Sequence, residues 1–209
     1  AKKALVPGAW LPNKLNEFTS ALGVHLIGSY VEGFIGIGST KAVKDPLNPK
    51  VDKGVLTRVP NMVVYTLGAK AMGYRPITIP YPDAVDGYPT AAAYTILGDV
   101  LKHWYATNYS MEYLAYMVSD KSWKKLTPED QKVFLDVAKK YTLKSIDNAK
   151  AEDDKYMALM EKKGIKVYRY TEAQLKPIKE ACVSTWEEVG KAGTGVELMK
   201  EFKQHLGNL

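Results

Sequence analysis

The pattern of apolar and polar positions predicts strands in the first part of the chain. Residues 24–27 and 33–38 are short apolar runs rich in β-branched residues and glycine, and each has the composition of a strand. The prolines and the asparagine of residues 44–50 mark a loop after them. We therefore expect two short strands and a linker before residue 55.

The next segment has the pattern of a strand, a helix and a second strand. Residues 55–59 predict the first strand, and residues 61–72 predict a helix, with Pro60 suited to its first turn and Gly73 ending it. Residues 76–79 predict the second strand. Two strands that are joined by a helix in this way are parallel, and the connection is right-handed.

Two helical segments and a strand are expected in the middle of the chain. Residues 91–104 have a helical pattern, and residues 113–119 are mostly apolar and predict a strand. Thr127 then occupies a typical N-cap position, with Pro128 as the first helical residue. The helical pattern continues to Lys163, which is long for a globular helix, so either one long helix or two abutting helices are expected.

The C-terminal part predicts one more strand and one more helix. Residues 165–170 alternate as a half-buried strand does, and residues 171–174, Thr-Glu-Ala-Gln, form a capping-box pattern that opens a helix. One stripe of this helix is apolar: Leu175, Ile178, Cys182, Trp186 and Val189. Because no cysteine-protease signature surrounds Cys182, we interpret it as a buried structural thiol.

Composition narrows the possible classes of protein. The chain has 209 residues, of which 46% are hydrophobic and 25% charged, as expected of a globular protein with one large domain or two lobes. No segment is apolar for long enough to predict a membrane-spanning helix, and the first ten residues lack the features of a signal peptide. One cysteine excludes an internal disulfide, and the three scattered histidines make a metal site unexpected.

The formal net charge of +6 raises two alternatives to a binding protein. A nucleic-acid-binding module needs a concentrated basic stripe with aromatic residues, whereas lysines and acids are interleaved here, as in residues 150–164. An enzyme acting on a small carboxylate needs a convergent base and nucleophile. The sequence has no nucleophile elbow, His-Glu-x-x-His motif or phosphate-binding loop, and it implies no cofactor.

Arg58 is the first candidate for a binding residue. It lies near the end of the strand predicted at residues 55–59, just before the following helix. In α/β proteins, anions bind at the carboxyl ends of parallel strands and at helix N-termini. The alternative is a surface ion pair with an acid such as Asp52, and the spacing alone does not decide between the two.

A series of short motifs in a fixed order resembles one family of proteins. The most specific are Lys-Gly-x-x-x-Arg-Val-Pro at residues 53–60, Val-Asp-Gly at residues 85–87, and Trp-x-x-Leu-x-Pro-Glu-Asp-Gln at residues 123–131. Over residues 24–190, the chain resembles the DctP-type solute-binding proteins of tripartite ATP-independent periplasmic (TRAP) transporters. Residues 1–23 match this family poorly.

The resemblance implies an α/β, two-lobed fold of the periplasmic binding protein type II, with a ligand cleft between the lobes and a long connecting helix. Residues 1–26 and 106–146 would form what is present of the first lobe, and residues 27–105 and 147–209 the second lobe. The implied function is the capture of a small organic acid in the periplasm and its delivery to the membrane permease subunits of the TRAP system. The resemblance implies no catalysis and no nucleic acid partner.

The resemblance also implies which residues contact the ligand. The arginine of the Arg-x-Pro element binds the ligand carboxylate in this family, which points to Arg58, and a guanidinium matches a carboxylate in a way that lysine does not. Asn61 matches an asparagine that bonds a ligand oxygen, or else it caps the next helix. Tyr81 matches an aromatic residue that packs on the ligand, or else it stacks on neighbouring prolines.

Four further positions correspond to cleft residues of the family: Phe34, Tyr88, Thr90 and Tyr109. Phe34 stands where relatives that bind acidic sugars have a second arginine. The motif with Tyr88 and Thr90 lacks a glutamate that helps to hold a metal ion in some relatives. We therefore expect no metal and predict a less polar monocarboxylate, aromatic or branched, although each aromatic residue has an alternative role in the core.

The chain also departs from the family in length. Relatives are longer, and they begin with a first-lobe series of strand, helix and strand that this sequence does not contain. They also carry a short helix between the positions of Asp83 and Val85. Because parallel strands need about a dozen residues to connect, we expect that segments of the family chain are omitted from this sequence.

Overall fold

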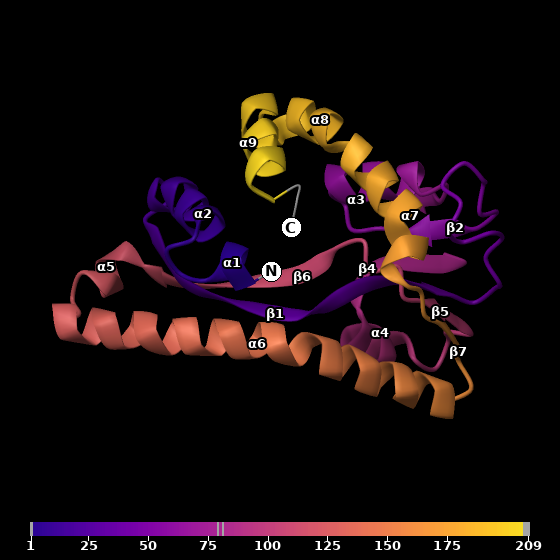
Figure 1. Cartoon of the computed structure of the whole chain (residues 1–209), viewed down its shortest axis with the longest axis horizontal. Coiled ribbons are helices and arrows are strands. Elements are labelled where there is room, and N and C mark those ends of the chain that lie inside the picture. The colour runs from indigo at the N-terminus through magenta and orange to yellow at the C-terminus, as the bar shows by residue number, and fades with distance from the viewer. Residues whose placement is uncertain (1, 79, 81, 207–209) are drawn as a thin grey trace. The chain divides into compact units, whose positions relative to one another are not determined.

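The structure, a computed structural model, describes residues 2–78, 80 and 82–206. These residues fall into two units, whose elements are labelled in Figure 1. Unit 1 contains residues 2–32 and 112–151, and unit 2 contains residues 33–111 and 152–206. The lobe boundaries expected near residues 26, 105 and 146 stay predictions.

Unit 1 combines short helices with parts of long elements. Its elements are α1 (Lys2–Leu5), α2 (Trp10–Ser20), the first part of β1 (Val24–Ser39), most of β6 (Met111–Ser119), α5 (Asp120–Trp123) and the first part of α6 (Pro128–Lys162). Strand β6 pairs with β1, and the strand predicted at residues 113–119 is confirmed. Helices α1 and α2 lie in the N-terminal segment, for which the pattern predicts no element.

Strand β1 is one continuous strand of 16 residues, so the prediction of two separate strands is wrong. The polar residues Ser29 and Glu32 interrupt the apolar pattern, but hydroxyls of α6 hold the backbone extended here. The Thr142 hydroxyl accepts from the Ser29 N–H at 3.0 Å and donates to the Ser29 carbonyl at 2.8 Å. The Ser145 hydroxyl accepts from the Val31 N–H at 3.1 Å. These bonds satisfy buried backbone groups that would otherwise be unpaired.

The close contact of β1 with α6 requires glycine. A Cβ on Gly28 would lie 2.7 Å from the Cβ of Ala138, which is closer than van der Waals contact allows. Gly28 therefore has a packing role in unit 1, which the sequence pattern alone did not indicate.

Helix α6 is a single helix of 35 residues, so the long helical pattern does not divide into two helices. Its start is as predicted. Pro128 is the first helical residue, and the Thr127 hydroxyl accepts from the N–H of Asp130 at 3.1 Å.

Six strands of the described residues form the sheet of unit 2, in the order β3-β2-β4-β1-β5-β7. The strands not yet named are β2 (Leu56–Arg58), β3 (Arg75–Ile77), β4 (Ala84–Pro89), β5 (His103–Tyr105) and β7 (Lys166–Tyr168). Strand β2 is parallel to β3 and β4, whereas β1 is antiparallel to β4 and β5. Helix α3 (Val63–Ala71) connects β2 to β3, so the predicted strand-helix-strand unit is confirmed, with the helix starting later than expected.

The helix predicted at residues 91–104 is only partly present. Helix α4 (Thr90–Leu97) is capped by Gly98, and the last residues of the predicted helix form strand β5 instead. Trp104 and Tyr105 are 0% and 1% exposed, and they pair with β1 on one side and β7 on the other. This pairing outweighs the local helical pattern, because tertiary packing overrides propensity.

Helices cover both faces of the unit 2 sheet, as Figure 1 shows. On one face, α3 and α7 (Glu172–Ser184) pack over a core that includes Ile37 and Ile178. On the other face, α4 and the last part of α6 pack over a core that includes Ala93 and Met160. The result is a three-layer α/β arrangement with the sheet in the middle.

Helix α7 begins with the predicted capping box, in which Thr171 and Gln174 bond to each other's backbone N–H. Cys182 is half-buried against the first of these cores, and burial raises the pKa of its thiol to about 12, as expected of a structural cysteine. The described chain continues with α8 (Trp186–Val189), η1 (Gly190–Thr194) and α9 (Val196–Leu206).

The link between β3 and β4 is short. The two strands lie on either side of β2, and residues 78–83 join them. At its end, the Asp83 carboxylate accepts from the Leu56 N–H at 3.3 Å and pairs with Lys41 at 2.5 Å. The helix that the family carries here is not present in the described residues of the link.

Candidate functional site

Arg58 lies at the carboxyl end of the parallel strand β2. Its side chain is half-buried, and its guanidinium carbon lies 5.8 Å from the centre of the Tyr88 ring, within cation–π range. Asp52, the surface acid considered as its partner, is paired with Arg75 instead, so that alternative is wrong. In the part of the chain that the structure describes, no carboxylate forms an ion pair with Arg58.

Exposed apolar side chains follow Arg58 at the start of α3. Asn61 is exposed and precedes the N-cap residue Met62, so the alternative that Asn61 caps this helix is wrong. Met62, Val63 and Val64 are 57%, 41% and 42% exposed, and no side chain caps the helix. An arginine that is followed in the chain by exposed apolar side chains and an uncapped helix N-terminus has the composition of a small-anion site. The sequence signal that we missed is this run of apolar residues at an exposed helix start.

The Lys-Gly part of the arginine motif has a structural role. Lys53 is 2% exposed, and its ammonium donates to the backbone carbonyls of Asp45 and Asn48, both at 2.6 Å. Burial lowers the pKa of this ammonium. Gly54 has a φ of 69°, a left-handed conformation that favours glycine. The motif therefore fixes the loop before β2 and presents its arginine at the strand's end.

Tyr109 is bonded to a buried carboxyl. Its hydroxyl donates to Asp86 and lies 2.7 and 2.8 Å from the two carboxyl oxygens. Asp86 is 0% exposed and also accepts from the Gly87 N–H at 2.6 Å. Burial raises the pKa of Asp86 to about 7, and the two hydrogen bonds offset part of this rise. Sequence reasoning missed Asp86, although an acid within an apolar strand segment is a recognisable signal.

Phe34, inside β1, and Thr90, directly after β4, each adjoin one strand pair, in which Ile35 of β1 is the register partner of Pro89 of β4. Phe34 is half-buried, and Thr90 is 3% exposed as the first residue of α4. Tyr81 lies outside the described residues. Their ligand contacts stay predictions.

Three of the predicted site residues, Arg58, Tyr88 and Tyr109, are linked by contacts with β4. Arg58 contacts Tyr88, Tyr88 lies two residues after Asp86, and the Asp86 carboxyl accepts a hydrogen bond from Tyr109. Arg58, Tyr88 and Tyr109 thus belong to one connected cluster in unit 2.

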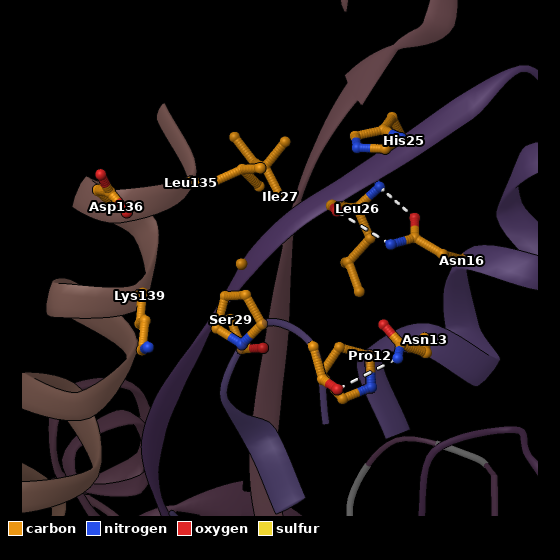
Figure 2. A pocket seen from close by; sticks show the side chains of 13 residues that line it. Pro12, Asn13, Asn16, His25, Leu26, Ile27, Ser29, Leu135, Asp136 and Lys139 are labelled. Atoms are coloured by element: carbon orange, nitrogen blue, oxygen red, sulfur yellow. Dashed lines mark hydrogen bonds between the residues drawn. The ribbon is translucent and has the colours of Figure 1, made fainter. Parts of the chain in front are cut away.

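A separate pocket of about 390 Å³ lies in unit 1 between α2, β1 and α6 (Figure 2). The described residues that line it include none of the predicted site residues. The Asn16 amide is bonded to the backbone of Leu26 in both directions, at 2.7 and 3.2 Å, and the Asn13 amide donates to the Gly8 carbonyl at 3.2 Å. The Asn16 bonds hold α2 against β1, and the Asn13 bond links two parts of the N-terminal segment, so both amides have a structural role.

Among the described residues, no three or more His, Cys, Asp or Glu side chains are grouped so that they could hold a metal ion. No helix in the described ranges is both long and apolar enough to cross a membrane.

The sequence matches a family model over most of its length. Residues 2–192 match the model of the bacterial extracellular solute-binding proteins, family 7, also called DctP. The chain belongs to this family. The resemblance to DctP-type proteins is thereby confirmed, and family 7 is a family of transport solute-binding proteins.

Solved structures of TRAP periplasmic solute-binding proteins share the fold of this family 7 chain. One from Desulfovibrio desulfuricans with bound sn-glycerol-3-phosphate is 20% identical with a TM-score of 0.74, over 90% of this chain and 63% of that chain. One from Rhodoferax ferrireducens with bound malonate is 19% identical with a TM-score of 0.77, and the match covers 93% of this chain and 66% of that chain. The periplasmic ectoine-binding protein of the TeaABC TRAP transporter of Halomonas elongata is 18% identical with a TM-score of 0.75, and the match covers 94% of this chain and 68% of that chain.

These matches confirm the predicted α/β fold of the periplasmic binding protein type. This chain spans 63% to 68% of the length of the three solved relatives.

Proposed function

We propose that this chain is the solute-binding component of a TRAP transporter, which captures a small organic acid in the periplasm and delivers it to the membrane permease. The family match supports the transport role. In this proposal, Arg58 binds the carboxylate of the ligand. The observation that carries it is a half-buried arginine at the carboxyl end of a parallel strand, with no carboxylate of the described chain paired to it.

A guanidinium at this position suits a carboxylate for two physical reasons. Its planar fork donates two parallel hydrogen bonds to the two carboxylate oxygens, and charge-assisted bonds of this kind are roughly twice as strong as neutral ones. The uncapped N-terminus of α3 follows Arg58 in the chain, and its backbone N–H groups add a further preference for an anion.

The surroundings of Arg58 favour a ligand with an apolar body. The Tyr88 ring lies against the guanidinium, and the exposed side chains of Met62 and Val63 offer apolar surface. Asn61 is exposed and supplies an amide for a ligand oxygen. We propose Phe34, Tyr81, Thr90 and Tyr109 as further residues of the site, and a monocarboxylate with a branched or aromatic group as the ligand.

The ligands of two similar proteins support an anion. Malonate and sn-glycerol-3-phosphate, which are bound in two of the solved relatives, both carry negative charge. They differ in carboxylate and phosphate chemistry, and a guanidinium binds both groups, so the choice of a carboxylate here rests on the resemblance of the arginine motif to that of the family.

A thermal-shift screen tests this function. The unmodified protein, Arg58→Ala and the matched control Arg75→Ala are each screened against malonate, sn-glycerol-3-phosphate, branched 2-oxo acids, phenylacetate and the uncharged amide phenylacetamide. A ligand that binds only the folded state raises the unfolding temperature by mass action.

We expect one class of acid to stabilise the unmodified protein and Arg75→Ala but not Arg58→Ala, and phenylacetamide to have no effect. If Arg58→Ala responds as the unmodified protein does, the role of Arg58 is wrong. If phosphate esters alone stabilise the protein, the carboxylate assignment is wrong.

A further inference from the structure

Asp86 lies where segments of the candidate site meet. It follows Val85, the register partner of Arg58, and its carboxyl is bonded to Tyr109 and to the Gly87 N–H. We propose that Asp86 is a positioning residue for the Arg58 site, and that a proton on its carboxyl strengthens the binding of an anionic ligand. The inference rests on the proposed function of Arg58.

Gly87 connects Asp86 to the loop that follows Arg58. A Cβ on Gly87 would lie 2.7 Å from Cγ of Pro60 and 3.3 Å from the ring of Tyr65, so the Gly87 backbone packs directly on both residues. Its φ of +85° is also a conformation that favours glycine. Because the Asp86 carboxyl accepts the Gly87 N–H, it fixes the peptide on which Pro60 rests.

Tyr109 connects Asp86 to strand β1. The loop that carries Tyr109 is bonded to Ile35 on both sides. The Asn108 N–H donates to the Ile35 carbonyl at 3.1 Å, and the Ile35 N–H donates to the Ser110 carbonyl at 3.0 Å. One carboxyl therefore joins the loop after β2, the loop after β5 and, through the latter, strand β1.

The charge of Asp86 has no counter-charge nearby. Among the described residues, no lysine, arginine or histidine pairs with it. The titratable groups around it are Tyr109 after β5, Tyr74 before β3 and Cys182 on α7, while Tyr65 of α3 faces Tyr109. Burial raises the pKa values of Tyr74, Tyr109 and Cys182 far above neutrality, so these groups keep their protons. Asp86, whose pKa burial raises to about 7, changes its charge near neutral pH.

The charge of Asp86 acts on the ligand through electrostatics. Val85 pairs with Arg58, and the Asp86 side chain, one residue further along β4, faces the α3 and α7 side of the sheet with Tyr109 and Cys182. An ionised Asp86 adds a negative charge to the strand that pairs with the Arg58 strand, and this charge opposes the approach of a carboxylate. A protonated Asp86 removes this repulsion and leaves the hydrogen-bonded geometry in place. Because linkage is reciprocal, binding of an anion must raise the proton affinity of Asp86, so binding near neutral pH takes up protons.

Calorimetric titration at two pH values tests the inference with the acid that stabilises the protein most in the screen. The proteins are the unmodified chain, Asp86→Asn, Tyr109→Phe and the control Asp83→Asn, which removes an acid whose pKa Lys41 holds below its usual range. Titrations in buffers of different ionisation enthalpy give the protons taken up per ligand.

For the unmodified chain and Asp83→Asn, we expect binding to be roughly threefold weaker, or more, at about pH 8 than at about pH 6, with proton uptake near neutral pH. Asp86→Asn removes both effects. Tyr109→Phe moves the affinity change to higher pH, because the Tyr109 hydrogen bond lowers the pKa of Asp86. If Asp86→Asn keeps the pH dependence and the proton uptake, the inference is wrong and the proposed function stands.

The ligand-free protein separates this inference from the proposed function. In amide NMR spectra recorded across neutral pH, the Gly87 and Asn61 signals should shift with one common midpoint in the unmodified chain and not in Asp86→Asn. If neither signal shifts, the positioning role of Asp86 is wrong whatever the ligand. If both shift and no acid binds at either pH, the proposed function fails, and the ligand half of the inference fails with it.

Discussion

Replacement of Asp86 by asparagine should make the protein more stable at neutral and alkaline pH. Asparagine has the shape of the protonated acid and cannot ionise. It can still accept the Gly87 N–H and exchange a hydrogen bond with Tyr109, which are the contacts of Asp86 in the structure. The substitution therefore removes the buried charge and keeps the buried contacts.

The magnitude follows from the pKa of Asp86, which burial raises from its ordinary value of 3.8 to about 7. Between these values the folded protein holds a proton that the unfolded chain has released, so folding stability falls as the pH rises through this window. A pKa difference of about 3 units at 1.36 kcal/mol per unit gives a loss of about 4 kcal/mol, complete above the folded-state pKa. Asp86→Asn does not undergo this loss.

Urea unfolding measured from about pH 4 to about pH 8 checks this prediction. The quantity to follow is the difference in the free energy of unfolding between Asp86→Asn and the unmodified protein, because other titrating groups cancel in it. This difference should grow by about 4 kcal/mol in favour of the variant across the range. A difference that stays constant with pH would refute the reasoning and show that Asp86 does not ionise near neutrality.

Three stability predictions concern the framework and use the same unfolding assay. Lys53→Met should lower the free energy of unfolding by about 2 to 4 kcal/mol, because it leaves two buried carbonyls unpaired. The exposed control Lys70→Met should lower it by less than about 0.5 kcal/mol, and equal losses would contradict the role of Lys53. Gly28→Ala should lower the free energy of unfolding by about 1 to 3 kcal/mol, because the added methyl group overpacks the contact with α6. Adding Ala138→Gly should recover part of this stability. No recovery would mean that the two residues do not collide. Thr171→Ala should cost about 1 kcal/mol through loss of the capping box, and an unchanged stability would contradict that cap.

Local signals in the sequence predicted the elements whose ends are marked by their own residues. The N-cap Thr127 with Pro128 gave the start of α6, and the capping box at Thr171 gave the start of α7. The segment at residues 91–104 was mispredicted, because the pairing of β5 with β1 and β7 is non-local and leaves no periodic trace. The sequence pattern predicted two strands in place of β1 for a similar reason, because Ser29 is bonded to a helix residue more than a hundred positions away in the chain.

The candidate site was only partly predictable. Arg58 was found from its place between a strand and a helix and from its motif, but the resemblance was needed to name a carboxylate. The sequence could not show that Asp52 pairs with Arg75 or that Lys53 is buried, because both facts depend on loop geometry. Asp86 was read only as part of the Val-Asp-Gly motif, because burial of a carboxyl without a cation becomes visible only when the neighbouring layers are in place.

The measurement that tests the central claim most directly is the affinity of Arg58→Lys for the best acid of the screen, compared with the unmodified protein and the control Arg75→Lys. Lysine keeps the positive charge but not the planar fork, so bidentate binding predicts a loss of about tenfold or more, equivalent to about 1.4 kcal/mol. The control should bind as the unmodified protein does, because Arg75 is engaged with Asp52. Equal affinity of Arg58→Lys and the unmodified protein would contradict the claim that the Arg58 guanidinium holds the ligand carboxylate.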